Sequence, residues 1–261
     1  MEERDAVLEF LTRSETRRVV LGRLAAEGPC RQSTLADVLG VSARTVKRTL
    51  DDLGDREWVT QTESGYALTA LGEQVMRTYE TAVTSLDAAA TLEPLLTHLR
   101  GDFCDIPVDA FADAEVVEAT KSSPNAPIER ALALRASADR LRELSSIVAK
   151  ESANQLHRRI RNGELSEAEL VLERDVLETI DETPAYRESF DEIVANPNVT
   201  SYVHDGPFPC LLILSEEHVA VGATNDDGFP AAIAVASSSD ARSWAESVYE
   251  RFRIEATRLP E

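Results

Sequence analysis

PCRQSTLADVLGVSARTVKRTLDDLGDREWV, residues 29–59, carries the strongest structural signal in this chain. Apolar residues recur at helical spacing on both sides of Gly40, so two short amphipathic helices are predicted to meet at a tight turn there. The spacing involves Leu35, Val38 and Leu39 before the turn, and Val46, Leu50 and Leu53 after it. Ser42 stands where its hydroxyl can cap the free N–H groups of the second helix. This pattern is typical of a helix-turn-helix.

The second helix is predicted to turn small polar and basic residues away from its packed face. A helix of this kind suits the major groove of DNA. The predicted DNA contacts are Arg31, Gln32, Ser42, Arg44, Thr45, Lys47, Arg48 and Thr62. Arg44, Thr45 and Arg48 are the best base readers, because long donors near a helix N-terminus reach purine edges. The alternative is a solvated helix face in a domain that binds other proteins.

The flanking segments extend this motif to a winged helix. A helix is predicted over residues 16–27, capped by Ser14, and strands over 58–62 and 66–68 enclose the turn Glu63-Ser64-Gly65. The wing tip is acidic, whereas wings that grip DNA usually carry Arg or Lys. A wing that does not contact DNA is therefore as well supported as one in which Gln61 and Thr62 contact phosphate. A helix from Thr69 to about Ala90 follows, which is predicted to pair with a second copy or to pack against its own C-terminal domain.

Helices and strands alternate in the remainder of the chain and predict an α/β domain. Strands are expected at 114–119, 145–149, 168–173, 199–203, 210–214, 219–223 and 231–236. Helices are expected from 128 to near 137, at 152–162, at 174–195 in one or two pieces, and after a cap at Ser239 or Asp240. The predicted fold class is multidomain α/β: a winged helix-turn-helix at 1–78, a helical connector or dimerisation segment at 79–113, and an effector domain at 114–261.

The charge of the 261-residue chain is uneven. Its net charge is −20; residues 1–78 hold 11 Lys+Arg against 13 Asp+Glu, whereas residues 79–261 hold 16 against 34. Only three of the basic residues are lysine. This composition is typical of proteins from halophiles, and an acidic mesophilic protein is the alternative. Because phosphate contacts weaken steeply with salt, a DNA-binding protein in such a cell depends more on base contacts, shape and dimerisation.

Other classes find little support in the sequence. No apolar run approaches the roughly 20 residues of a membrane span, and no signal segment is recognisable, so a cytoplasmic protein without a membrane partner is predicted. Cys30, Cys104 and Cys210 suggest neither a disulfide framework nor a zinc site, and Cys30 is predicted to be a small core residue rather than a redox switch. No cofactor is predicted.

Two parts of the chain resemble known families. Residues 16–78 resemble winged-helix domains of archaeal transcription regulators, on LADVLGVSARTVKRTLDDL and the tail GYALTALG. Residues from about 114 resemble the effector domain of archaeal methanogenesis regulators, on SPNAPIERALALRASADRLRELSSIVA, AELVLERDVLETI, NVTSYVHD and HVAVGATNDDG. That effector family is similar to phospholipase D-like folds, whose enzymes need His-x-Lys. Here His218 is followed by Val219 and Ala220, so the resemblance implies a sensor or dimerisation domain without catalytic residues.

Polar loops of the C-terminal half form a second candidate site. The candidate ligand-binding residues are His204, Asp205, Glu217, His218 and Asn225. Such residues bind hard cations or a small metabolite, but Asn and Asp also simply make turns. The sequence therefore predicts a sequence-specific DNA-binding transcription regulator, acting as a homodimer, with a C-terminal domain that senses a small-molecule effector or mediates assembly. The alternatives are a phospholipase D-like phosphodiesterase and a winged-helix scaffold for other proteins.

Overall fold

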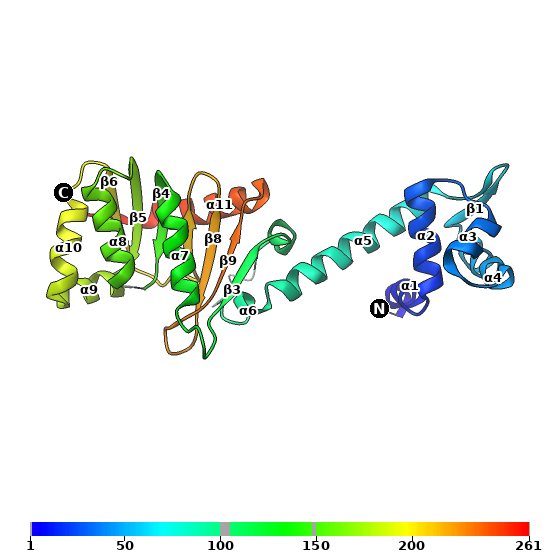
Figure 1. Cartoon of the computed structure of the whole chain (residues 1–261), viewed down its shortest axis with the longest axis horizontal. Coiled ribbons are helices and arrows are strands. Elements are labelled where there is room, and N and C mark those ends of the chain that lie inside the picture. The colour runs from blue at the N-terminus through cyan, green and yellow to red at the C-terminus, as the bar shows by residue number, and fades with distance from the viewer. Residues whose placement is uncertain (1, 100–104, 148–149, 261) are drawn as a thin grey trace. The chain divides into compact units, whose positions relative to one another are not determined.

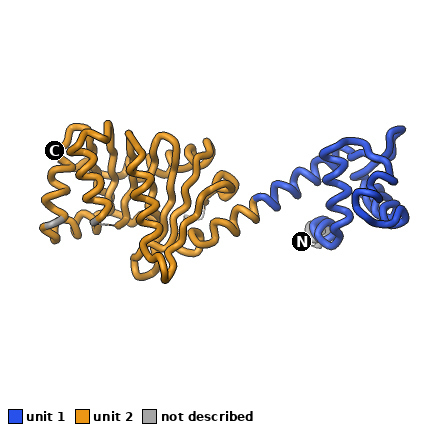
Figure 2. Tube along the Cα trace, viewed as in Figure 1, with its two compact units in different colours: residues 1–84 blue, residues 85–261 orange. Residues whose placement is uncertain are grey.

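The computed structural model describes residues 2–99, 105–147 and 150–260. The chain divides into two compact units, Met1–Thr84 and Ser85–Glu261 (Figures 1 and 2). Helix α5 (Ala70–Thr91) crosses the boundary between them. Thr69 caps this helix as expected, because its hydroxyl oxygen accepts a hydrogen bond from the backbone N–H of Gly72.

The first unit is a winged helix, which confirms the fold predicted for it. Its elements are α1 (Glu2–Thr12), α2 (Glu15–Glu27), α3 (Gln32–Leu39), α4 (Ala43–Gly54), β1 (Val59–Thr62) and β2 (Gly65–Leu68). The predicted caps form, because Ser14 and Ser42 accept hydrogen bonds from the backbone N–H groups of Arg17 and Thr45. Gly40 ends α3 in the left-handed conformation, which glycine adopts at little cost.

Tertiary packing in this unit follows the predicted periodicity, with one correction. Val46, Leu50 and Leu53 are buried in the core. Val38, which was predicted to belong to the packed face of α3, is instead 49% exposed. It lies about 100° around the helix from Leu39, at the edge of the packed stripe.

The second unit contains, within the described residues, one eight-stranded mixed sheet in the order β10-β6-β5-β4-β7-β8-β9-β3. Strands β4, β5 and β6 pair in parallel, while β4 pairs antiparallel with β7. The strands are β3 (Glu115–Glu118), β4 (Arg140–Ser145), β5 (Glu167–Glu173), β6 (Val199–His204), β7 (Leu211–Leu214), β8 (Val219–Thr224), β9 (Pro230–Ala236) and β10 (Thr257–Arg258). This arrangement confirms the predicted α/β class.

Helices cover both faces of this sheet (Figure 1). They are α6 (Glu93–Leu96), η1 (Val108–Phe111), α7 (Ala126–Ser137), α8 (Lys150–Arg161), α9 (Arg174–Glu182), α10 (Pro184–Val194) and α11 (Ser239–Glu255). Helices α7, α8 and α10 bury Leu134, Ile160 and Ile193 on one face. Helices α6 and α11, with η1, bury Leu95, Phe111 and Tyr249 on the other.

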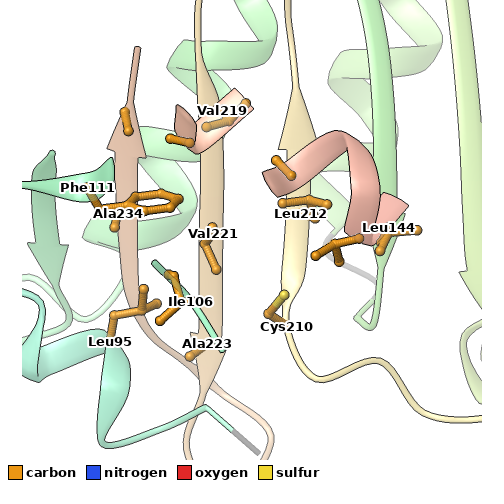
Figure 3. Close-up of a cluster of buried hydrophobic side chains, with 14 of the residues drawn as sticks. Leu95, Ile106, Phe111, Leu144, Cys210, Leu212, Val219, Val221, Ala223 and Ala234 are labelled. Atoms are coloured by element: carbon orange, nitrogen blue, oxygen red, sulfur yellow. The ribbon is translucent and has the colours of Figure 1, made fainter. Parts of the chain in front are cut away.

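Each central strand contributes alternate residues to the two cores, as the pleat of a strand requires. Leu212 and Leu214 of β7 face α11, whereas Ile213 faces the α7 side. In β8, Val219, Val221 and Ala223 likewise face α11 (Figure 3). Both faces are apolar because both are covered, which explains the continuous apolar runs in the sequence.

Two local predictions are corrected by the structure, and one short strand was not predicted. The strand expected at 145–149 is wrong: β4 ends at Ser145, and residues 148–149 lie outside the described residues. The sequence RLREL of β4, residues 140–144, consists of strong helix formers. Packing of this segment in the sheet overrides its helix propensity. The cap of α11 is Ser238 rather than Ser239 or Asp240, and β10 was not predicted at all.

Candidate functional site

The exposed face of α4 carries three of the predicted DNA contacts. Arg44, Lys47 and Arg48 are all exposed, because Val46 and Leu50 turn the opposite side of the helix into the core. Among the residues that the structure describes, neither Arg44 nor Arg48 forms an ion pair. Their guanidinium groups therefore project from the helix without a carboxylate partner.

Lys47 differs from the two arginines because it is already paired. Its ammonium group donates to the carboxylate of Asp51, one turn along the exposed face. This hydrogen bond raises the pKa of Lys47 above its ordinary value. Asp51 must be displaced or shared before Lys47 can hold a phosphate.

The other predicted contacts also serve the fold. Ser42 caps α4, and its hydroxyl lies 2.9 Å from that of Thr45. The side-chain amide of Gln32 donates to the carbonyl of Ala43 at 2.8 Å, which ties α3 to the start of α4. The hydroxyl of Thr62 donates to the carbonyl of Gly65 at 2.9 Å and closes the wing turn. Arg31, by contrast, has an exposed side chain just before α3.

Charge along α4 is graded from its start to its end. Its first turn contains no acidic residue, and Arg44, Lys47 and Arg48 all lie in its first half. Asp51 and Asp52 lie in the last two turns, where Asp52 pairs with Arg17 at 2.9 Å. The helix dipole and the side chains both make the N-terminal half the positive end, which attracts phosphate.

The five candidate ligand-binding residues of the second unit do not form one site. His204, Asp205 and Asn225 lie at or just beyond the carboxyl ends of β6 and β8. Glu217 and His218 lie in the β7–β8 turn, at the opposite end of those strands. Figure 3 shows this separation along the hairpin, with Val219 at one end and Ala223 at the other.

Turn formation accounts for much of this set. The side-chain oxygen of Asn225 accepts the backbone N–H groups of Asp227 and Phe229 at 3.1 and 2.9 Å. Asp205 forms an ion pair with Arg174. Within residues 2–99, 105–147 and 150–260, no group of three or more His, Cys, Asp or Glu side chains is arranged to hold a metal ion.

Comparison with protein families relates both units to known domains. Residues 124–255 match the family described as the methanogenesis regulatory protein FilR1, middle domain. The chain belongs to this FilR1 family. Residues 5–91 match the HVO_A0261 N-terminal domain. The predicted relationship of the C-terminal half to a methanogenesis-regulator domain is confirmed.

Solved structures similar to this FilR1-family chain include three of different kinds. TrmBL2, an archaeal chromatin protein, is 12% identical in an alignment that covers 98% of this chain and 99% of the TrmBL2 chain, with a TM-score of 0.45. Nuc from Salmonella typhimurium, a phospholipase D family member, is 14% identical over 57% of this chain and 98% of its own length, with a TM-score of 0.42. The transcriptional regulator Tm0710 from Thermotoga maritima is 26% identical over 31% of this chain and 66% of its own length, with a TM-score of 0.25. No curated protein matches the chain.

Two remaining predictions concern cysteines and membranes. Cys30 is buried in the core of the first unit and Cys210 in that of the second, both as free thiols, while Cys104 lies outside the described residues. Among the described helices, none is long and apolar enough to span a membrane.

Proposed function

We propose that this FilR1-family protein is a sequence-specific DNA-binding transcription regulator that acts as a homodimer. The observation that carries the proposal is the exposed N-terminal half of α4, where Arg44 and Arg48 have no carboxylate partner in the described part of the chain. Long donors at this position of a recognition helix reach base edges in the major groove. Membership of a family described as regulatory also supports this function.

The charge distribution defines how this protein would bind. The second unit is strongly acidic and repels a DNA duplex, so α4 and the segment around it must provide the attraction. If the cell is halophilic, as the composition suggests, molar salt screens both effects within about 3 Å. Base contacts from Arg44 and Arg48 would then contribute more to affinity than phosphate contacts do.

The experiment that tests this function is capture of sheared genomic DNA by the full chain in molar KCl, followed by sequencing. Enrichment of discrete sites near promoters is the expected result. Uniform recovery of all fragments, or recovery of none, would overturn the proposal. If proteins were captured in place of DNA, the winged helix would be a scaffold instead.

Helix α5 is the proposed dimerisation element, because its apolar side chains include several that the chain leaves uncovered. Leu71 is 49% exposed and Leu86 is 69% exposed. A Leu86→Glu variant is expected to shift the protein from dimer to monomer, since a charge in a helix–helix seam must be desolvated. Sedimentation velocity in molar KCl measures the mass directly.

Thr84→Glu is the matched control for this variant. It adds the same charge to the same exposed helix, two residues earlier and therefore about 160° around it. It should remain dimeric. A monomeric parent protein, or a Leu86→Glu variant that is still dimeric, would contradict the assignment of α5.

A further inference from the structure

A cavity of about 600 Å³ opens in the second unit at the carboxyl ends of its parallel strands. Its walls include Ile147 after β4, Glu173 at the end of β5, and residues 207–210 between β6 and β7. The strand order reverses at β4, because β5 and β6 follow it on one side in the sheet and β7 pairs with its other side. Ligands of open α/β sheets bind outside the carboxyl ends of strands at such a switch point, in pockets of about 300–1,000 Å³.

Aromatic side chains form one wall of this carboxyl-end cavity. The rings of Phe208 and Phe252 meet edge to face, with centroids 5.2 Å apart. The ring of His204 lies behind them, at 5.5 Å from Phe208 and 5.3 Å from Phe252. The carboxylate of Glu173 accepts the backbone N–H of Phe208 and so holds that residue in place. The cavity therefore has a preformed apolar surface.

Arg251 of α11 supplies a positive charge at the mouth of the cavity. Its side chain is exposed, and its guanidinium carbon lies 5.2 Å from the ring centroid of Phe252. Its charge also reaches Cys210 in the wall of the cavity. Burial raises the pKa of the Cys210 thiol to about 12, and the positive charge of Arg251 opposes that rise. A guanidinium has five N–H donors, so it can hold a ligand anion as well as contacts within the protein.

We propose that this cavity binds a small organic anion with an aromatic body. Arg251 pairs with its carboxylate or sulfonate group at the mouth, and the aromatic body packs on Phe208 and Phe252. His98 also lines the cavity, seven residues beyond the end of α5. A bound ligand would thus contact the segment that leads to the first unit, and its role as an effector rests on the proposed function.

The test is a fluorescence titration of the full chain in molar KCl with 1-anilinonaphthalene-8-sulfonate, an aromatic anion. We expect saturable binding of one probe per chain, and at least tenfold weaker binding by an Arg251→Gln variant. Arg253→Gln is the matched control, because it removes the same charge from the same helix. Arg253 pairs with Glu169 and Glu250 and does not line the cavity. The affinity of the Arg253→Gln variant for the probe should stay within twofold of the affinity of the parent protein.

Three results would each overturn the proposal: no saturable binding by the parent protein, unchanged affinity in Arg251→Gln, or an equal loss in Arg253→Gln. Far-UV circular dichroism of each variant verifies that the probe is not reporting unfolded protein. No DNA is present in this titration. Its failure therefore concerns the cavity alone, whereas failure of the genomic capture concerns the DNA-binding function.

Discussion

A double variant, Arg44→Ala with Arg48→Ala, is expected to lose nearly all sequence-specific DNA binding. A good contact between an arginine and a base edge contributes about 1–3 kcal/mol, so two contacts contribute about 2–6 kcal/mol. That range corresponds to a loss of affinity of roughly thirtyfold to twenty-thousandfold. Gel shifts with a captured genomic site, at fixed KCl concentration, measure it. Both side chains are exposed, so the core of the winged helix should be unaffected.

Arg13→Ala is the matched control for this double variant. Arg13 is an exposed arginine of the same unit, paired with Glu9 at the end of α1 rather than lying on α4. Its loss should change affinity by less than threefold. The fluorescence of Trp58, which is buried in the core of this unit, reports whether each variant is folded. Intact binding by a folded double variant would reject α4 as the recognition helix.

The winged helix could be predicted from sequence because its determinants are local. The caps at Ser14 and Ser42 and the repeat of Val46, Leu50 and Leu53 all lie within a turn or two of the elements they define. The bond from Gln32 to the carbonyl of Ala43 was not predictable, because it depends on how α3 and α4 cross. The pairing of Lys47 with Asp51 follows from local spacing, because residues four apart on a helix are neighbours on its surface.

The second unit was harder to predict where distant segments meet. The carboxyl-end cavity draws on segments as far apart as His98 and Phe252, and no spacing in the sequence brings these together. The polar turns at His218 and Asn225 look alike in sequence, yet the hairpin places them at opposite ends. Strand β4 was misassigned because it contains Arg and Glu at positions that a buried strand normally fills with apolar residues. One of those residues, Glu143, has a large expected effect on stability.

Replacing Glu143 by alanine is expected to destabilise the second unit by about 3–5 kcal/mol. Glu143 is 5% exposed in the middle of β4, beside Leu170 of β5 and Ile213 of β7. Its carboxylate accepts two hydrogen bonds from Arg135 of α7, at 2.9 and 2.5 Å. Arg135 is only 6% exposed, so the variant would leave a buried guanidinium without a counter-charge.

Urea unfolding at fixed KCl concentration measures this loss, in a Trp58→Phe background in which Trp244 of α11 reports on the second unit. The informative control is the double variant Arg135→Met with Glu143→Leu. It removes both charges together, and apolar replacements of a buried ion pair are often neutral or stabilising. The single variant should therefore be much less stable than the double. If the two were equally unstable, lost packing rather than an unpaired charge would be the cause. If Glu143→Ala cost less than about 1 kcal/mol, water would have to reach Arg135, and the interior between α7 and β4 would be more open than its burial indicates.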